Sequence, residues 1–120
     1  MFKVLVVDDE PFVREGLKGL IDWEKYGFSI CQEAGDGEEA LRIINEDEPD
    51  LIITDVKMPV MDGLELIRQS VSVLHARCRF IILSGYNDFT YAKTAIKYNV
   101  KNYILKPVDE DELVETLVQI

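Results

Sequence analysis

The sequence has little of what marks several common protein classes. It holds only two cysteines, Cys31 and Cys78, which lie far apart and form no CxxC motif. This usage is typical of a cytoplasmic protein whose thiols are reduced and mostly buried. No apolar run approaches the roughly 20 residues of a membrane helix. The N-terminus also lacks the basic start, longer apolar stretch and small-residue cleavage site of a signal peptide. We therefore expect a cytoplasmic domain that does not enter a membrane.

Positive charge is scarce as well. The 120 residues include 13 Lys and Arg against 23 Asp and Glu, which gives a formal net charge of −10. Binding to the phosphates of a nucleic acid requires positive charge, so this balance argues against nucleic-acid binding by this segment itself. The same balance suits cations and basic protein surfaces.

Strand-like runs alternate with helical patterns along the whole chain. The length predicts one domain, residues 1–120, and 48% apolar with 30% charged residues is ordinary for a globular domain. The expected strands are 4–7, 29–34, 51–54, 80–83 and 102–105. The expected helices begin near Pro11, Asp36, Leu64, Asp88 and Asp109, with Asp36 and Asp109 as N-caps. Five strands alternating with five helices indicate an α/β fold built on a doubly wound, five-stranded parallel sheet.

The expected strands end in charged or polar residues. Asp8 and Asp9 follow the first strand and Asp55 follows the third, whereas Ser84 and Lys106 follow the fourth and fifth. In an open α/β sheet, ligands bind outside the carboxyl ends of the strands, where the strand order reverses. In the flavodoxin-like order 2-1-3-4-5, the first and third strands are neighbours. The three aspartates would then converge on one pocket, and Ser84 and Lys106 would reach it from the other side.

Three carboxylates in one crevice need a proton or a cation among them. Two unit charges about 4 Å apart repel by roughly 4 kcal/mol at an effective dielectric of 20. Oxygen ligands without His or Cys indicate Mg²⁺ or Mn²⁺. Lys106 and the Ser84 hydroxyl suit the charge and oxygens of a phosphoryl group, and a carboxylate can accept that group as an aspartyl phosphate. Each residue alone has an ordinary explanation, as a loop cap, a turn residue or a solvated charge. Their joint placement at strand ends favours the phosphoryl site.

With these motifs in their order and spacing, the sequence resembles the receiver domain of two-component response regulators. The resemblance covers essentially all of residues 2–120. The segments that carry it are 4–9 with Glu10 and Pro11, 55–59 with 61–63, Ser84–Gly85, and 103–107. None of these segments is specific alone, whereas the ordered set is very specific. The resemblance implies the receiver fold and the chemistry of a phospho-acceptor domain.

The resemblance also assigns a role to each residue of the expected pocket. It implies that Asp55 is the phospho-acceptor, that Asp9 binds Mg²⁺ directly and that Asp8 acts mainly through metal-bound water. Lys57 would supply a backbone carbonyl to the metal. Ser84 would bond a phosphoryl oxygen, and Lys106 would pair with the phosphoryl charge.

Further implied roles concern the lifetime of the phosphoryl group and the conformational switch. The side chains of Lys57 and Tyr86 would tune the lifetime, and the Lys106–Pro107 bond would be cis, as is usual in the family. On phosphorylation, Ser84 would move toward the phosphoryl group and Tyr103 would rotate inward. The face made by the fourth helix, the fifth strand and the fifth helix would then repack.

A finer resemblance, in residues 22–28 and 84–93, is to regulators with a C-terminal AraC-type helix-turn-helix output domain. It implies a sensor histidine kinase as the donor, homodimer formation on phosphorylation, and DNA contact by the output domain alone. The chain stops at Ile120 inside an apolar helical pattern, so we expect it to be the N-terminal part of a longer protein.

Three other functions fit parts of the pattern. A stand-alone phosphorelay receiver would use the same pocket without an output domain. A Mg²⁺-dependent aspartyl-phosphate hydrolase usually has an Asp-x-Asp pair after the first strand, whereas Asp8 and Asp9 are adjacent here. A flavodoxin-like FMN carrier would need a Ser/Thr/Gly-rich phosphate loop, where this chain has three acidic residues, 8–10. The receiver domain is therefore the favoured hypothesis, and we expect a regulatory domain that catalyses only its own phosphorylation and dephosphorylation.

Overall fold

A computed structural model of the chain describes residues 1–120 except 57, 59, 73–77, 86–99 and 107. Its strands are β1 (Phe2–Val7), β2 (Phe28–Ala34), β3 (Leu51–Asp55), β4 (Arg79–Ser84) and β5 (Val100–Leu105). Its helices are α1 (Pro11–Leu20), the 3-10 helix η1 (Trp23–Tyr26), α2 (Gly37–Asp47), α3 (Gly63–Ser72) and α5 (Glu110–Val118). The expected fourth helix falls outside the described residues.

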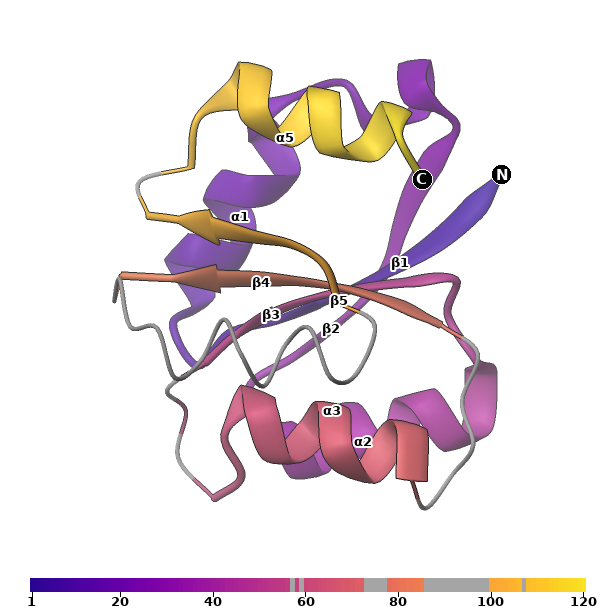
Figure 1. The fold of residues 1–120 in the computed structure, drawn as a ribbon, viewed down its shortest axis with the longest axis vertical. Coiled ribbons are helices and arrows are strands. Elements are labelled where there is room, and N and C mark those ends of the chain that lie inside the picture. The colour runs from indigo at the N-terminus through magenta and orange to yellow at the C-terminus, as the bar shows by residue number, and fades with distance from the viewer. Residues whose placement is uncertain (57, 59, 73–77, 86–99, 107) are drawn as a thin grey trace.

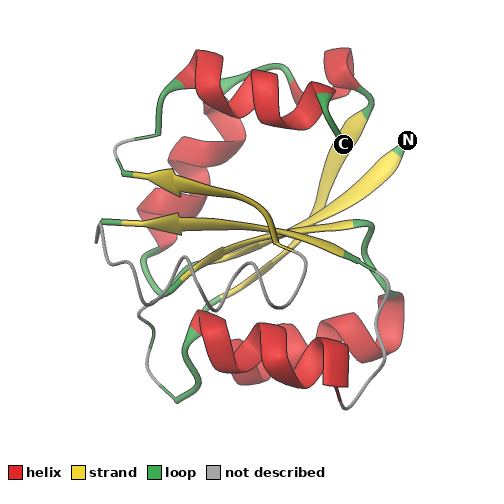
Figure 2. Ribbon diagram, viewed as in Figure 1, coloured by secondary structure: helices red, strands yellow, loops and turns green. Residues whose placement is uncertain are grey.

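The five strands form one parallel sheet in the order β2-β1-β3-β4-β5, which confirms the predicted topology. In Figure 1, α1 and α5 lie on one side of the sheet and α2 and α3 on the other. Figure 2 shows the same arrangement as a layer of strands between two layers of helices. The order places β1 beside β3, so the residues that follow these two strands lie next to each other.

The central strands β1, β3 and β4 are mostly apolar because both faces of the sheet are covered there. Leu5 and Val7 of β1 pack on the side of α2 and α3, whereas Val4 and Val6 pack on the side of α1 and α5. Successive side chains of a strand point to opposite faces, so a strand between two helix layers needs an apolar residue at each position. The result is a stiff sheet whose carboxyl ends hold the polar residues.

The segment between α1 and β2 contains η1, which is followed by Gly27 with φ 85°. The structure corrects the expectation for one cysteine. Cys31 is exposed, not buried, because β2 has an irregular register there: Val4 pairs with Ile30 and Leu5 with Gln32. Such a bulge leaves the extra residue of an edge strand without a partner residue on the neighbouring strand.

In the described part of the chain, no helix has the length and apolar character to span a membrane.

The two expected N-caps differ in the structure. The Asp36 carboxylate accepts a hydrogen bond of 2.9 Å from the Glu39 backbone N–H, as predicted. Asp109 occupies the N-cap position of α5, but its side chain makes no capping hydrogen bond. Sequence spacing locates such a position without fixing the side-chain rotamer, so the prediction for the Asp109 side chain was wrong.

Gly63 permits the close approach of α3 to the end of β3. Its backbone N–H donates to the Val56 carbonyl at 2.7 Å, and a Cβ atom at this position would collide with the Asp55 carbonyl oxygen. Glycine is therefore required where the chain returns past the residue that ends β3.

We expect Gly63→Ala to lower the free energy of unfolding by about 3 kcal/mol, because backbone atoms around Asp55 must move. Urea unfolding followed by circular dichroism measures this. The control is Gly16→Ala in the middle of α1, where a Cβ meets nothing within 4 Å. Alanine there should stabilise the domain by about 0.5–1 kcal/mol. Equal effects of the two substitutions would contradict the packing argument.

Candidate functional site

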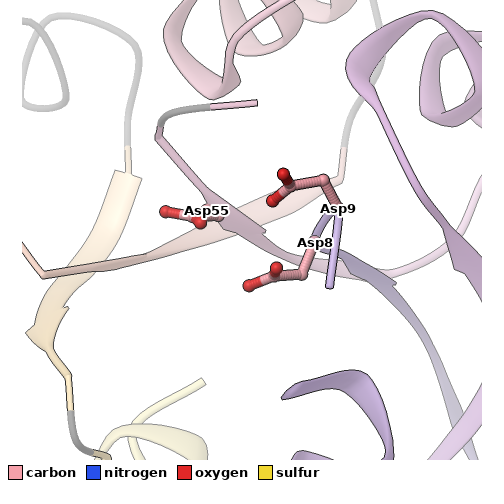
Figure 3. Close-up of side chains that lie close together, drawn as sticks. All are labelled: Asp8, Asp9 and Asp55. Carbon is pink, nitrogen blue, oxygen red and sulfur yellow. The ribbon is translucent and has the colours of Figure 1, made fainter. Parts of the chain in front are cut away.

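Three aspartates lie together at the carboxyl ends of β1 and β3. Figure 3 shows the carboxylates of Asp8, Asp9 and Asp55 close to one another, and one oxygen of each lies within 4.8 Å of the others. Asp8 is buried, Asp55 is partly buried and Asp9 is exposed. The neighbouring positions of β1 and β3 in the sheet bring Asp8 and Asp55 together across a long separation in sequence. The convergence of the three residues, expected from the strand order, is present in the structure.

The two inner carboxylates are oriented by their own backbones. Asp8 Oδ1 accepts a hydrogen bond of 3.0 Å from the Glu10 N–H, and Asp55 Oδ1 accepts one of 2.7 Å from the Val56 N–H. The Oδ2 atom of each carboxylate is then directed to a shared partner. That partner is Lys106, whose Nζ lies 3.0 Å from Asp8 Oδ2 and 3.2 Å from Asp55 Oδ2.

Lys106 comes to this position from the end of β5. Its backbone N–H donates to the Ser84 carbonyl at 2.8 Å, which extends the pairing of β4 and β5 by one hydrogen bond. Its side chain extends past the carboxyl ends of the strands, so that the ammonium contacts the two carboxylates. The backbones of the three charged residues are held by strand pairing, so little backbone entropy remains to be lost when a ligand binds.

Burial and charge shift the pKa values of this group in a consistent way. Burial is the largest effect on Asp55 and raises the pKa of its carboxyl, the charge of Asp8 adds to the rise, and Lys106 opposes it. Burial disfavours the Lys106 ammonium, but the hydrogen bond to Asp8 and the charge of Asp55 outweigh it and raise the pKa of Lys106. Lys106 therefore stays charged, whereas ionised Asp55 is held at a cost in free energy.

The residues present fit a hard divalent cation. The cluster offers carboxylate oxygens from three residues, Asp8, Asp9 and Asp55, and the Lys106 ammonium contacts two of them. One ammonium cannot balance three carboxylates, and a divalent cation would balance the other two charges. Oxygen donors at this spacing are what Mg²⁺ and Mn²⁺ prefer.

Ser84 and Tyr103 occupy strands on the other side of β3. Ser84 ends β4 and is buried, one position beyond Leu83, the residue that pairs with Asp55. Tyr103 of β5 is half-buried and packs against the core on the side of α2 and α3. Lys57, Tyr86 and Pro107, for which roles were expected, fall outside the described residues.

Sequence reasoning missed one residue that contacts this site. Arg14 of α1 donates from Nη1 to the backbone carbonyl of Asp8 at 2.5 Å. A signal was present, because Arg14 follows the acidic segment 8–10 by about one turn of the helix that begins there.

The family model for the response regulator receiver domain matches residues 4–118. The uncharacterized transcriptional regulatory protein YesN of Bacillus subtilis (strain 168) is 47% identical over 120 residues, which cover 100% of this chain and 32% of that protein. The chain therefore spans about a third of the length of this relative.

Solved structures agree with the family match. The REC domain of AraT, a response regulator from Geobacillus stearothermophilus, has a TM-score of 0.88 and 40% identity, covering 98% of this chain and 91% of that one. A two component transcriptional regulator AraC from Clostridium phytofermentans ISDg has a TM-score of 0.87 and 38% identity, covering 99% and 92%. Fold, family model and relatives agree: the chain belongs to the response regulator receiver domain family, with regulators of the AraC type among its relatives.

Proposed function

We propose that this domain is a phosphorylation-controlled switch that accepts a phosphoryl group on Asp55 from a sensor histidine kinase. One observation carries the proposal. The Oδ2 atoms of Asp55 and Asp8 meet the Lys106 ammonium at the carboxyl ends of parallel strands, with Asp9 alongside. A nucleophilic carboxylate, a fixed cation and acidic metal ligands are the parts that phosphoryl transfer requires.

In the proposed transfer, Asp55 Oδ2 attacks the phosphorus in line while Oδ1 stays bonded to the Val56 N–H. An O–P bond forms, and the bond from phosphorus to the histidine nitrogen of the donor breaks with its electron pair on the nitrogen. Lys106 then turns from the Asp55 carboxylate to the phosphoryl oxygens. Ser84, which ends the neighbouring strand, donates its hydroxyl to another of these oxygens.

Receiver domains bind Mg²⁺ through an acidic pocket, and this chain has such a cluster. When bound, the cation supplies positive charge that offsets the negative charge on the transferring group. We assign Asp9, Asp55 and the Lys57 backbone carbonyl as its direct ligands and Asp8 as a ligand that acts mainly through metal-bound water, with Mn²⁺ as a substitute. The carboxylates of Asp8 and Asp55 already have one oxygen each bonded to backbone N–H groups, which holds their direction.

A surface beside Lys106 supports docking of the protein donor. Residues of α1 and of the segment after β5 line an apolar groove of about 260 Å³; they are Val13, Gly16, Leu17, Leu20, Lys106 and Val108. Phe12, at the start of α1, is 75% exposed. Apolar surface next to a reactive group is what a protein partner would cover while presenting its phosphohistidine.

The output of the switch belongs to a longer protein. Relatives such as YesN are transcriptional regulators of which this domain covers about a third. We infer a cytoplasmic regulator in which residues 1–120 precede a helix-turn-helix domain of the AraC type. In it, phosphorylation changes the surface near β5 and α5 through Ser84 and Tyr103 and promotes a homodimer. The net charge of −10 leaves DNA contact to the output domain.

Incubation with acetyl phosphate and Mg²⁺ tests the acceptor. We expect intact-mass spectrometry to show one added phosphoryl group on the wild-type domain, and none on Asp55→Asn or in excess EDTA. Arg42→Gln on α2, which removes an exposed ion pair with Glu46, is the matched control and should be modified normally. An adduct that persists in Asp55→Asn would assign the acceptor to another carboxylate. Rapid multiple turnover of a phosphate ester would favour a hydrolase.

The cost of ionised Asp55 predicts a stabilised variant. The folded state raises the pKa of Asp55, so between the unfolded and the folded pKa the folded domain keeps a proton that the unfolded chain has released. The free energy of unfolding therefore falls as pH rises from the unfolded pKa to the folded pKa. Asp55→Asn removes this loss. We expect its Tm at pH 7 in EDTA to exceed that of the wild type by a few degrees, and the difference to vanish below about pH 3. Calorimetry measures both, and a lower Tm at pH 7 would refute the argument.

Tyr103 is expected to couple the phosphoryl group to the surface near α5. In Tyr103→Ala, we expect the phosphoryl adduct to form as in the wild type, while the phosphorylation-induced changes in amide chemical shifts of α5 are mostly lost. Tyr103→Phe retains the ring that packs against the core and should keep those changes. Full shift changes in Tyr103→Ala would remove the switch role from this residue.

A further inference from the structure

Arg14 connects α1 and the edge strand β2 to the segment that carries the first two aspartates. Its Nη1 donates to the Asp8 carbonyl oxygen at 2.5 Å, and its Nε donates to Glu33 Oε1 of β2 at 3.1 Å. Both side chains are mostly shielded from solvent, with Arg14 18% and Glu33 29% exposed. The planar guanidinium thus makes two hydrogen bonds in fixed relative directions.

Glu33 is itself held in place by a second cation. Lys18 Nζ lies 2.7 Å from Glu33 Oε2, while Arg14 bonds the other carboxylate oxygen. The hydrogen bond from Lys18 lowers the pKa of Glu33 most, Arg14 lowers it further, and burial opposes both. Glu33 is therefore an ionised acceptor at neutral pH, and it fixes the guanidinium of Arg14 by charge and direction.

The carbonyl that Arg14 binds belongs to the peptide bond between Asp8 and Asp9. A peptide is planar, so the direction of its carbonyl sets the directions in which the flanking residues continue. The neighbouring peptide is held as well, because the Asp8 N–H donates to the Ala34 carbonyl of β2 at 3.1 Å. The peptide groups on both sides of Asp8 are thus oriented by partners from α1 and β2, and the second of them also precedes Asp9.

We propose that Arg14, oriented by Glu33, is a positioning residue that turns the Asp8–Asp9 peptide so that both carboxylates face one cation. The inference rests on the proposed function, since it requires that the aspartate cluster binds Mg²⁺. Arg14 contacts neither a carboxylate oxygen of the cluster nor Lys106 among the described hydrogen bonds. It acts through the backbone.

The direction in which Mg²⁺ affinity changes when Arg14 is replaced distinguishes a positioning role from a purely electrostatic one. A guanidinium beside an acidic cluster repels a second cation, so removing it should tighten Mg²⁺ binding if charge alone matters. If Arg14 positions the peptide, removing it should weaken binding. Arg14→Lys keeps the charge but loses the two-pronged geometry, so charge alone predicts no change there and positioning predicts weaker binding.

Isothermal titration of the unphosphorylated domain with Mg²⁺ provides the test. We expect the Kd to rise about tenfold in both Arg14→Lys and Arg14→Gln, which is the usual size when a group that orients metal ligands is lost. Glu33→Gln should weaken binding in the same direction by a smaller factor. The double variant Arg14→Gln with Glu33→Gln should bind no more weakly than Arg14→Gln, because Glu33 acts through Arg14.

Matched controls separate this effect from general destabilisation. Arg42→Lys alters an exposed ion pair of α2 with Glu46 and should leave the Kd unchanged. Urea unfolding of each variant shows whether a weakened Kd follows the loss of stability. Ile44→Val in the core beneath α2 destabilises the domain away from the aspartates, and a normal Kd in that variant supports positioning. If both Arg14 variants fail to fold, Glu33→Asp decides by its Kd, because it keeps the charge and Arg14 but shortens the side chain that orients the guanidinium.

The outcomes are distinct from those that test the proposed function. A wild-type domain that binds neither Mg²⁺ nor a phosphoryl group would refute the proposed function. A wild-type domain that binds Mg²⁺, with an unchanged Kd in Arg14→Lys or a lower Kd in Arg14→Gln, would overturn the positioning role alone. An unchanged Kd in Glu33→Asp, where that variant decides, would overturn it too.

Discussion

The contact of the Lys106 ammonium with Asp8 and Asp55 is the constraint on which the site depends. Carboxylates from three residues share a small volume, and two of them are shielded from solvent, so their repulsion is stronger than it would be in water. The fold places one internal cation, Lys106, among the carboxylates. Two negative charges remain, which a divalent cation would balance. The parallel order of the strands supplies the rest, because it brings the ends of β1, β3 and β5 to one edge of the sheet.

A site of this kind needs a stiff support, since an ionised Asp55 opposes folding. The support is the double-sided core, in which the central strands are buried on both faces by helices. The sheet accommodates a carboxylate whose ionised form is disfavoured by burial. Stability is thus given up at the residue where the proposed chemistry needs a nucleophile, as is common at functional sites.

The sequence predicted well what depends on local pattern and strand order. The alternation of strands and helices follows from the apolar runs and their breaks. The order 2-1-3-4-5 was the flavodoxin-like order that the receiver resemblance implies, and the meeting of Asp8, Asp9 and Asp55 follows once that order is given. It did not predict the bulge that exposes Cys31, since register at an edge strand depends on contacts with one neighbour only. Nor did it predict the contact of Arg14 with Asp8, because helical spacing does not determine which partner a long side chain reaches.

The site has a fixed side and an adjustable side, and this division bears on how a switch can work. On the fixed side, the Ala34 carbonyl of β2 and the Arg14 side chain of α1 hold both peptide groups of Asp8. On the adjustable side, Lys106 reaches the carboxylates through a long side chain, while its backbone is bonded to Ser84 and leads into α5. A phosphoryl group on Asp55 would add charge that Lys106 and Ser84 both attract. In the proposed switch, the free energy gained from new contacts with the phosphoryl group would therefore act on the adjustable side, toward β5 and α5.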